Sequence, residues 1–201
     1  QATTEETFTA NFDSGSEAID TSTVVFDPNN SDSYNSSYTT TVYDSLGNEH
    51  SLSQYFIKTG DNQWEVLYTF DGVEQDTITP LTFDSTGKLT TPSTPPTLTF
   101  PVDGADPISM TIDYSDCTQY GSAFSVTTNT ANGYASATQN GVQVDDDGKV
   151  YATYSNGERM LQGQVVLATF PDESGLEGAV FRELAESGSS MLGTSQAAIY
   201  A

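Results

Sequence analysis

Apolar and polar residues alternate with a period of two in several short stretches of this chain. Residues 64–70 (WEVLYTF) and 108–114 (ISMTIDY) are the clearest examples, and Trp64 and Ile108 open their two apolar sets. Because successive side chains of a β-strand point to opposite faces of its sheet, this alternation predicts strands with one buried face. Helical periodicity is weak, and its best candidate is residues 177–187 (EGAVFRELAES). The pattern therefore predicts an all-β protein.

Two other stretches depart from simple alternation. Residues 163–170 (GQVVLATF) are apolar on both faces, which predicts a central strand that is covered on both sides. Pro92, Pro95 and Pro96 cannot donate hydrogen bonds to a neighbouring strand, so their segment is predicted to be a loop or a sheet edge.

A change in composition marks a domain boundary. Ser, Thr, Asn and Gly crowd together around Ala131, where apolar residues become sparse. We therefore expect two small β domains. Residues 1–130 should form a barrel-like or sandwich-like domain, and residues 131–201 should belong to a second β-rich domain.

A turn signature recurs between the predicted strands. The stretches FDSTGKL (83–89) and VDDDGKV (144–150) place an Asp three residues before a Gly, and YDSLGNE and YSNGER are looser versions. An Asp at the first turn position accepts a hydrogen bond from the backbone ahead of it, and the Gly then takes the left-handed conformation that redirects the returning strand. The stretches are therefore predicted to be hairpin tips. The residues expected to shape them are Asp44, Gly47, Asp84, Gly87, Asp145, Gly148 and Gly157.

His50, the single histidine, follows one of these turns in the stretch TVYDSLGNEHSL. If Asp44 and Gly47 form the turn, His50 lies just inside the returning strand of the hairpin. We therefore interpret it as a surface or strand-pairing side chain and not as a catalytic base.

The charge balance is strongly acidic, with 5 Lys and Arg residues against 28 Asp and Glu residues and a net charge of −23. Such a chain repels phosphate groups, so neither nucleic acid nor an anionic membrane surface is an expected partner. The many acids are explained by a solvated acidic exterior that keeps the protein soluble, and a cation-binding site is the alternative explanation. Residues 143–154 resemble a calcium loop, but Gln143 and Tyr154 occupy positions at which an EF-hand requires carboxylates. No cofactor or metal is therefore expected.

Catalytic motifs are missing from the sequence. Cys117 is the only cysteine, so no disulfide can form within the chain, and no nucleophile elbow, phosphate-binding loop or zinc-spaced His/Cys pair occurs. No apolar run approaches the roughly 20 residues of a membrane span. Two alternatives stay open: a hydrolase that uses paired carboxylates, and a secreted β-sandwich binding module, an adhesin or carbohydrate-binding domain, with Trp64 as a stacking platform.

Residues 38–70 (YTTTVYDSLGNEHSLSQYFIKTGDNQWEVLYTF) resemble the middle domain of bacterial flagellar hook proteins. The stretches 118–126, 132–177 and 187–195 also resemble that family. The block 132–177 is shared more widely among the rod and hook proteins of the flagellar axis. The poorest match lies between Asp71 and Asp116.

The resemblance implies an extracellular structural subunit without catalysis. Hook proteins assemble into a helical tube that links the motor rod to the filament and bends as a universal joint. Residues 1–130 would be the complete outer domain, and residues 131–201 the C-terminal part of the inner domain, without the terminal helices. The implied partners are further copies of the chain, together with the hook-cap, rod and hook–filament junction proteins, and the isolated chain is expected to be monomeric. Some hook proteins join a cysteine to a neighbour's lysine, which we do not expect of Cys117.

The turn assignment makes a direct prediction. Replacing Gly87 or Gly148 with Val should destabilise the fold by about 1–2 kcal/mol, because a branched residue is forced to positive φ. The measurement is the melting temperature of each variant, and unchanged values would contradict the assignment.

Overall fold

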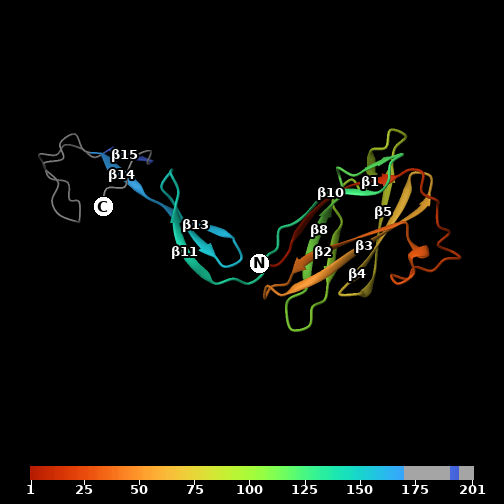
Figure 1. Cartoon of the computed structure of the whole chain (residues 1–201), viewed down its shortest axis with the longest axis horizontal. Coiled ribbons are helices and arrows are strands. Elements are labelled where there is room, and N and C mark those ends of the chain that lie inside the picture. Colours follow the sequence, from red (N-terminus) through yellow and green to blue (C-terminus); the bar gives the residue numbers. More distant parts are fainter. Residues whose placement is uncertain (170–190, 195–201) are drawn as a thin grey trace, which may run out of the picture. The chain divides into compact units, whose positions relative to one another are not determined.

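The computed structural model describes residues 1–169 and 191–194 (Figure 1). The chain divides into two compact units, Gln1–Ser136 (unit 1) and Ala137–Ala201 (unit 2). The composition indicates a boundary near Ala131, and the boundary between the units lies a few residues later in the chain. Strands dominate the described part of both units, which confirms the all-β class, and the weak helix candidate at residues 177–187 lies outside the described residues.

One sheet of unit 1 is an antiparallel meander of five strands (Figure 1). Consecutive strands pair along its whole length, as expected for short strands that are joined by tight turns. Its strands, in spatial order, are β2 (Ser36–Tyr43), β3 (Glu49–Gly60), β4 (Gln63–Phe70), β5 (Val73–Phe83) and β6 (Leu89–Thr91).

The second sheet of unit 1 joins residues that are far apart in the chain. Strand β1 pairs antiparallel with β10 and parallel with β8 and β9, and β8 also pairs with β7. Its strands are β1 (Glu5–Asp13), β7 (Thr97–Phe100), β8 (Ile108–Asp113), β9 (Thr118–Tyr120) and β10 (Ser125–Ala131). Residues 92–96, with the three prolines, form the connection between β6 and β7, which confirms the predicted loop.

The two ends of unit 1 lie side by side. Gln1 and Tyr134 exchange backbone hydrogen bonds of 2.9 and 3.0 Å. The backbone amides of Thr4 and Glu5 both donate to the Asn132 side-chain oxygen, at 2.9 and 3.1 Å. The pairing of β1 with β10 is thereby extended beyond both strands.

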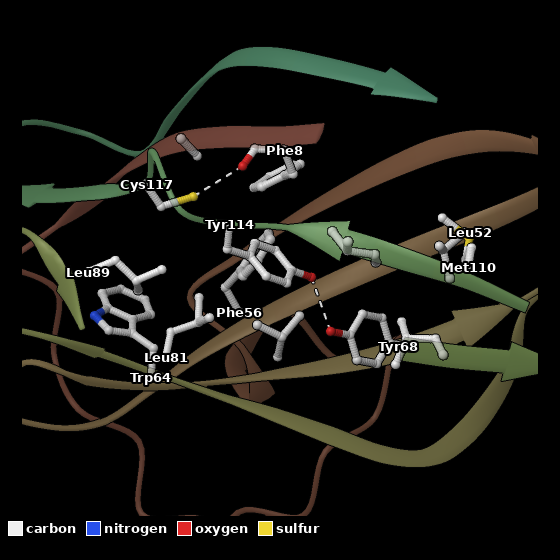
Figure 2. Packing of buried hydrophobic residues seen from close by; sticks show 14 of the residues in the cluster. Phe8, Leu52, Phe56, Trp64, Tyr68, Leu81, Leu89, Met110, Tyr114 and Cys117 are labelled. Atoms are coloured by element: carbon white, nitrogen blue, oxygen red, sulfur yellow. Dashed lines mark hydrogen bonds between the residues drawn. The ribbon is translucent and has the colours of Figure 1, made fainter. Parts of the chain in front are cut away.

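The core of unit 1 lies between its two sheets (Figure 2). Phe8 on β1 stacks on Phe56 of β3, with ring centroids 5.4 Å apart. Phe12, also on β1, meets Phe56 and Trp64 edge-on, with both centroid distances at 5.1 Å. The apolar set that begins at Trp64 is buried, as the alternation predicts, but Leu67 and Thr69 on the other face of β4 are buried as well, so the expectation of a single buried face is wrong for this part of the strand.

A long connection between β1 and β2 runs along strand β3 and contains the short 3-10 helix η1 (Ser31–Ser33). Lys58 on β3 holds this connection, because its ammonium group donates to the carbonyl oxygens of Ser14 and Ser16 at 2.6 and 2.9 Å. The backbone amide of Asn35 donates to the Phe56 carbonyl, and the Asn35 side chain accepts from the Lys58 amide. The connection is therefore fastened to the sheet at both of its ends.

Unit 2 contains a three-stranded antiparallel sheet and a separate strand pair. The first comprises β11 (Gln139–Val144), β12 (Lys149–Tyr154) and β13 (Arg159–Gln164), and the second comprises β14 (Val166–Thr169) and β15 (Met191–Thr194). The single strand expected over residues 163–170 is therefore wrong. Strand β13 ends at Gln164 because its partner β12 begins at Lys149: the Val165 amide still donates to the Gly148 carbonyl in the same register, but Gly148 belongs to the β11–β12 turn.

Two glycines of unit 1 separate the effect of backbone strain from that of close packing. Gly72 and Gly87 have φ of 79° and 81°, but a Cβ on Gly72 would meet no atom within 4 Å, whereas one on Gly87 would clash with the Gln119 carbonyl oxygen. Gly72→Ala should cost about 1 kcal/mol from left-handed strain alone, and Gly87→Ala roughly 3 kcal/mol. The clash with the Gln119 carbonyl oxygen therefore raises the cost at Gly87 above the value that positive φ alone predicts from the sequence. Urea unfolding followed by Trp64 fluorescence measures both, and equal losses would contradict the packing argument.

Candidate functional site

The Asp and Gly residues that the sequence singles out lie in four separate hairpin turns. They connect β2 to β3, β5 to β6, β11 to β12 and β12 to β13. In the first of these turns, Asp44 Oδ1 accepts hydrogen bonds from the backbone amides of Leu46 and Asn48, both at 2.8 Å. The four turn glycines all have positive φ: Gly47 82°, Gly87 81°, Gly148 73° and Gly157 87°.

The acids of the other two Asp turns are used in the same way. Asp84 accepts from the Thr86 hydroxyl and from the backbone amides of Thr86 and Lys88. The Thr86 hydroxyl and these amides lower the pKa of Asp84. Asp145 accepts from the amides of Asp147 and Lys149, so its Oδ1 serves the turn. Within residues 1–169 and 191–194, no group of three or more His, Cys, Asp or Glu side chains is arranged to hold a metal ion.

His50 forms a contact that the sequence does not predict. Its Nδ1 lies 2.7 Å from Asp71 Oδ2, and its Nε2 lies 3.5 Å from Asp44 Oδ2. The ring stacks on Phe70 with centroids 5.1 Å apart, and Phe70 stacks in turn on Phe100. His50 therefore joins the β2–β3 turn to the β4–β5 turn above the edge of the aromatic core.

The two carboxylates favour the charged imidazolium. Burial lowers the pKa of His50, but the hydrogen bonds to Asp71 and Asp44 outweigh it and raise the pKa above 6.5. Burial likewise raises the pKa of Asp44, but the hydrogen bonds from Asn48, His50 and Leu46 prevail and lower it to about 2. When protonated, His50 can donate from both ring nitrogens to these two carboxylates, so its contacts are those of a structural residue.

Cys117 and Trp64 are parts of the core (Figure 2). The Cys117 thiol donates to the Phe8 carbonyl at 3.3 Å, and burial raises its pKa to about 12, so it remains a neutral thiol without nucleophilic character. Trp64 is 2% exposed, and its indole Nε1 donates to Gln119 Oε1 at 2.7 Å. Trp64 therefore offers no stacking platform to a ligand, and the interpretation as a carbohydrate-binding module is not supported.

The surfaces of both units carry exposed apolar side chains among polar ones. On β5 these are Val73 and Ile78, which are 65% and 52% exposed, and on unit 2 they include Val142 and Leu161 at 63% and 55%. No helix in the described part of the chain is long and apolar enough to cross a membrane. The described surface is therefore formed by β-strands and by the hairpin turns that connect them.

These features define a β module whose conspicuous residues shape turns and pack a core. A family model described as the flagellar basal body protein FlaE D2 domain matches residues 11–134. The chain belongs to this flagellar family, and the resemblance identified in its sequence is confirmed.

Relatives with curated descriptions agree with this placement. The flagellar hook protein FlgE of Escherichia coli strain K12 is 38% identical over 178 residues, which cover 84% of this chain and 44% of that protein. The hook protein FlgE of Rhizobium meliloti strain 1021 is 37% identical over 164 residues, which cover 73% of this chain and 39% of that protein. The chain thus spans less than half the length of these relatives.

A solved structure shares the fold. The crystal structure of the Helicobacter pylori flagellar hook protein FlgE2 matches with a TM-score of 0.60 and 19% identity. The match covers 80% of this chain and 39% of that one. At this identity the likeness concerns the fold alone.

The His50 contact predicts a pH dependence with two limbs. Because its folded pKa is raised, His50 stabilises the fold below pH 6.5, and this contribution is lost as pH rises through the folded value. Asp44 and Asp71, whose pKa values are lowered, contribute above their unfolded value of 3.8, and this is lost as pH falls towards about 2 for Asp44.

Proton NMR of the single imidazole measures the first limb directly. We expect a titration midpoint above 6.5, and Asp71→Asn should move it downwards because one acceptor of the imidazolium is removed. Asp76→Asn is the matched control, since Asp76 is an exposed acid on β5. A midpoint that is indifferent to Asp71→Asn would show that the contact is not made in solution.

Proposed function

We propose that this chain is a structural subunit of the bacterial flagellar hook, located outside the cell, which works through packing between subunits and without catalysis. The observation that carries the proposal is the family match over residues 11–134 together with 38% identity to a hook protein along most of the chain. A hook subunit must present rigid surfaces to its neighbours. Unit 1, with its buried aromatic core and the turn glycines Gly47 and Gly87, has the required character.

The domain assignment is part of the proposal. Unit 1 corresponds to the outer domain of the hook subunit, with its limit near residues 130–136, and unit 2 corresponds to the C-terminal part of the inner domain. The position of the family model, which ends at residue 134, supports the first assignment. The likeness of residues 132–177 to rod and hook proteins in general supports the second.

Self-association is the proposed mode of action. Repeated heterologous contacts that combine rotation and rise generate an open helix, and such contacts do not require a ligand cleft. Polar, shallow contacts suit subunits that must slide as a tube bends. Copies of the chain, and the hook-cap, rod and hook–filament junction proteins, are the proposed partners, and the isolated chain is proposed to be monomeric.

The acidic charge of the chain fits the proposed location outside the cell. A net charge of −23 opposes association at low ionic strength, but salt screens exposed charges over about 8 Å at physiological concentration. Weak contacts between acidic copies are therefore favoured in a saline medium outside the cell. His50 and Cys117, the two residues with the most recognisable chemistry, are both engaged in structural contacts.

A chimera tests the proposal. The aligned segment of the Escherichia coli hook protein is replaced by this chain in a strain that lacks its own hook gene. Electron microscopy of isolated flagella should show hook tubes, and soft agar should show at least partial swimming. The matched control carries Trp64→Asp, which places a charge in the core and should abolish both results.

The result that would overturn the proposal is equally direct. A chimera that is folded and secreted into the medium, as shown by circular dichroism and immunoblot, but forms no tubes would contradict a role as hook subunit. Hooks formed by both the chimera and its Trp64→Asp control would show that the fold of unit 1 does not matter to assembly.

A further inference from the structure

Glu6 is a buried acid in the centre of unit 1. It lies on β1 in phase with Phe8 and Phe12, so the strand period that buries those rings also directs the Glu6 side chain into the core. Only 1% of the residue is exposed. No cationic side chain pairs with it. Among the described residues, the cations that form ion pairs are His50 and Lys149, and their partners are other acids. An uncompensated carboxylate in such a place is costly.

The partners of Glu6 come from the opposite sheet. Glu6 Oε1 lies 2.9 Å from the Thr40 hydroxyl on β2 and 2.9 Å from the Gln54 Nε2 on β3. Glu6 Oε2 is buried and has no hydrogen-bond partner. The side chain therefore forms a polar link between the two sheets, and all of its contacts involve one of its oxygens.

The Thr40 hydroxyl is where the hydrogen count decides the protonation state. It lies within hydrogen-bond distance of two acceptors, Glu6 Oε1 at 2.9 Å and Asn129 Oδ1 at 3.1 Å, but a hydroxyl has only one hydrogen to donate. If Glu6 is ionised, the single hydroxyl hydrogen can lie in only one of these two contacts, so the other brings two oxygen atoms to hydrogen-bond distance with no hydrogen between them. If Glu6 carries a proton on Oε1, it donates to Thr40 and Thr40 donates to Asn129, so each of the two oxygen–oxygen contacts holds a hydrogen.

The groups that face Glu6 from the other elements are neutral. Tyr68 on β4 and Tyr114, just after β8, are the titratable groups whose charges would couple to it, and their hydroxyls lie 3.0 Å apart (Figure 2). Burial raises the pKa of Tyr68 to about 12 and that of Tyr114 well above its ordinary value, so both stay protonated. The Tyr114 hydroxyl donates to Gln54 Oε1 at 2.5 Å, which orients the Gln54 amide towards Glu6.

We propose that Glu6 is a proton-binding site: the folded protein holds it as the neutral acid, and release of this proton weakens the polar link between β1 and the β2–β3 hairpin. The same conclusion follows from burial, which raises the pKa of Glu6 to about 7 against the opposing effect of Thr40 and Gln54. This inference is independent of the proposed function, since it concerns the stability of unit 1 alone.

The sign of the effect is opposite to that of an ordinary acid. The folded pKa of Glu6 lies above its unfolded value of 4.5, so its contribution to stability is fully present below pH 4.5 and is lost as pH rises through about 7. His50 acts in the same direction at higher pH, so a variant is needed to separate the two groups.

Glu6→Gln mimics the neutral acid and provides that separation. Urea unfolding of the full chain, followed by Trp64 fluorescence, is measured between pH 5 and 8 for the wild type, for Glu6→Gln and for Glu5→Gln. Glu5 precedes Glu6 on the same strand and is exposed. Relative to Glu6→Gln, the folding equilibrium constant of the wild type should fall on the order of 100-fold over this interval. Glu5→Gln should follow the wild type.

Carbon NMR of the carboxyl groups provides a second measurement on the unmodified protein. The Glu6 resonance should titrate with a midpoint near pH 7. A midpoint below pH 5, or a Glu6→Gln profile that runs parallel to the wild type, would overturn the proposal. If Glu6→Gln does not fold, the carboxyl titration decides alone.

Discussion

The insertion of Phe8 and Phe12 between the two sheets of unit 1 is the interaction on which the rest of the structure depends. Strand β1 carries both rings, and they contact Phe56 and Trp64 on the opposite sheet. The same strand is hydrogen-bonded to β8, β9 and β10, which lie roughly a hundred residues later in the chain. Without β1 the second sheet would lose its central strand and the core one of its walls. The hairpin turns and the contacts at the sheet edges add to a core that is completed by this strand.

The sequence alone predicts the local structure well and the long-range structure poorly. Alternation in residues 64–70, the Asp and Gly turns and the three prolines each have a cause that acts within a few residues, and the structure has a strand, hairpins and a loop there. The pairing of β1 with β8 and β9 depends on which distant surfaces bury each other, and no local signal specifies it. The strand expected over residues 163–170 is wrong for a similar reason, because β13 stops where its partner β12 gives way to the turn at Gly148.

The buried polar residues show which features of a side chain a sequence pattern can predict. Glu6 stands in phase with Phe8 and Phe12, so its burial could be read from the strand period once β1 was recognised as a strand. Its partners could not, since Thr40 and Gln54 belong to another sheet. His50 was predicted to lie in a returning strand, and it does, but its contact with Asp71 depends on how two neighbouring hairpin ends are aligned. Sequence patterns therefore locate such side chains on a face, and only the assembled sheets select their partners.

The adjacent ends of unit 1 have a consequence for how such a module can be exchanged. A polypeptide that enters at Gln1 and leaves at Tyr134 crosses to a host protein at a single point, because these residues are joined by backbone hydrogen bonds. The host then only has to tolerate a gap as wide as a strand pair, and the entropy of closing that gap is nearly independent of what is inserted. Outgrowths of very different size could thus be carried at the same position without disturbing the host fold. Variation in the length of related chains would accordingly be concentrated in the inserted part.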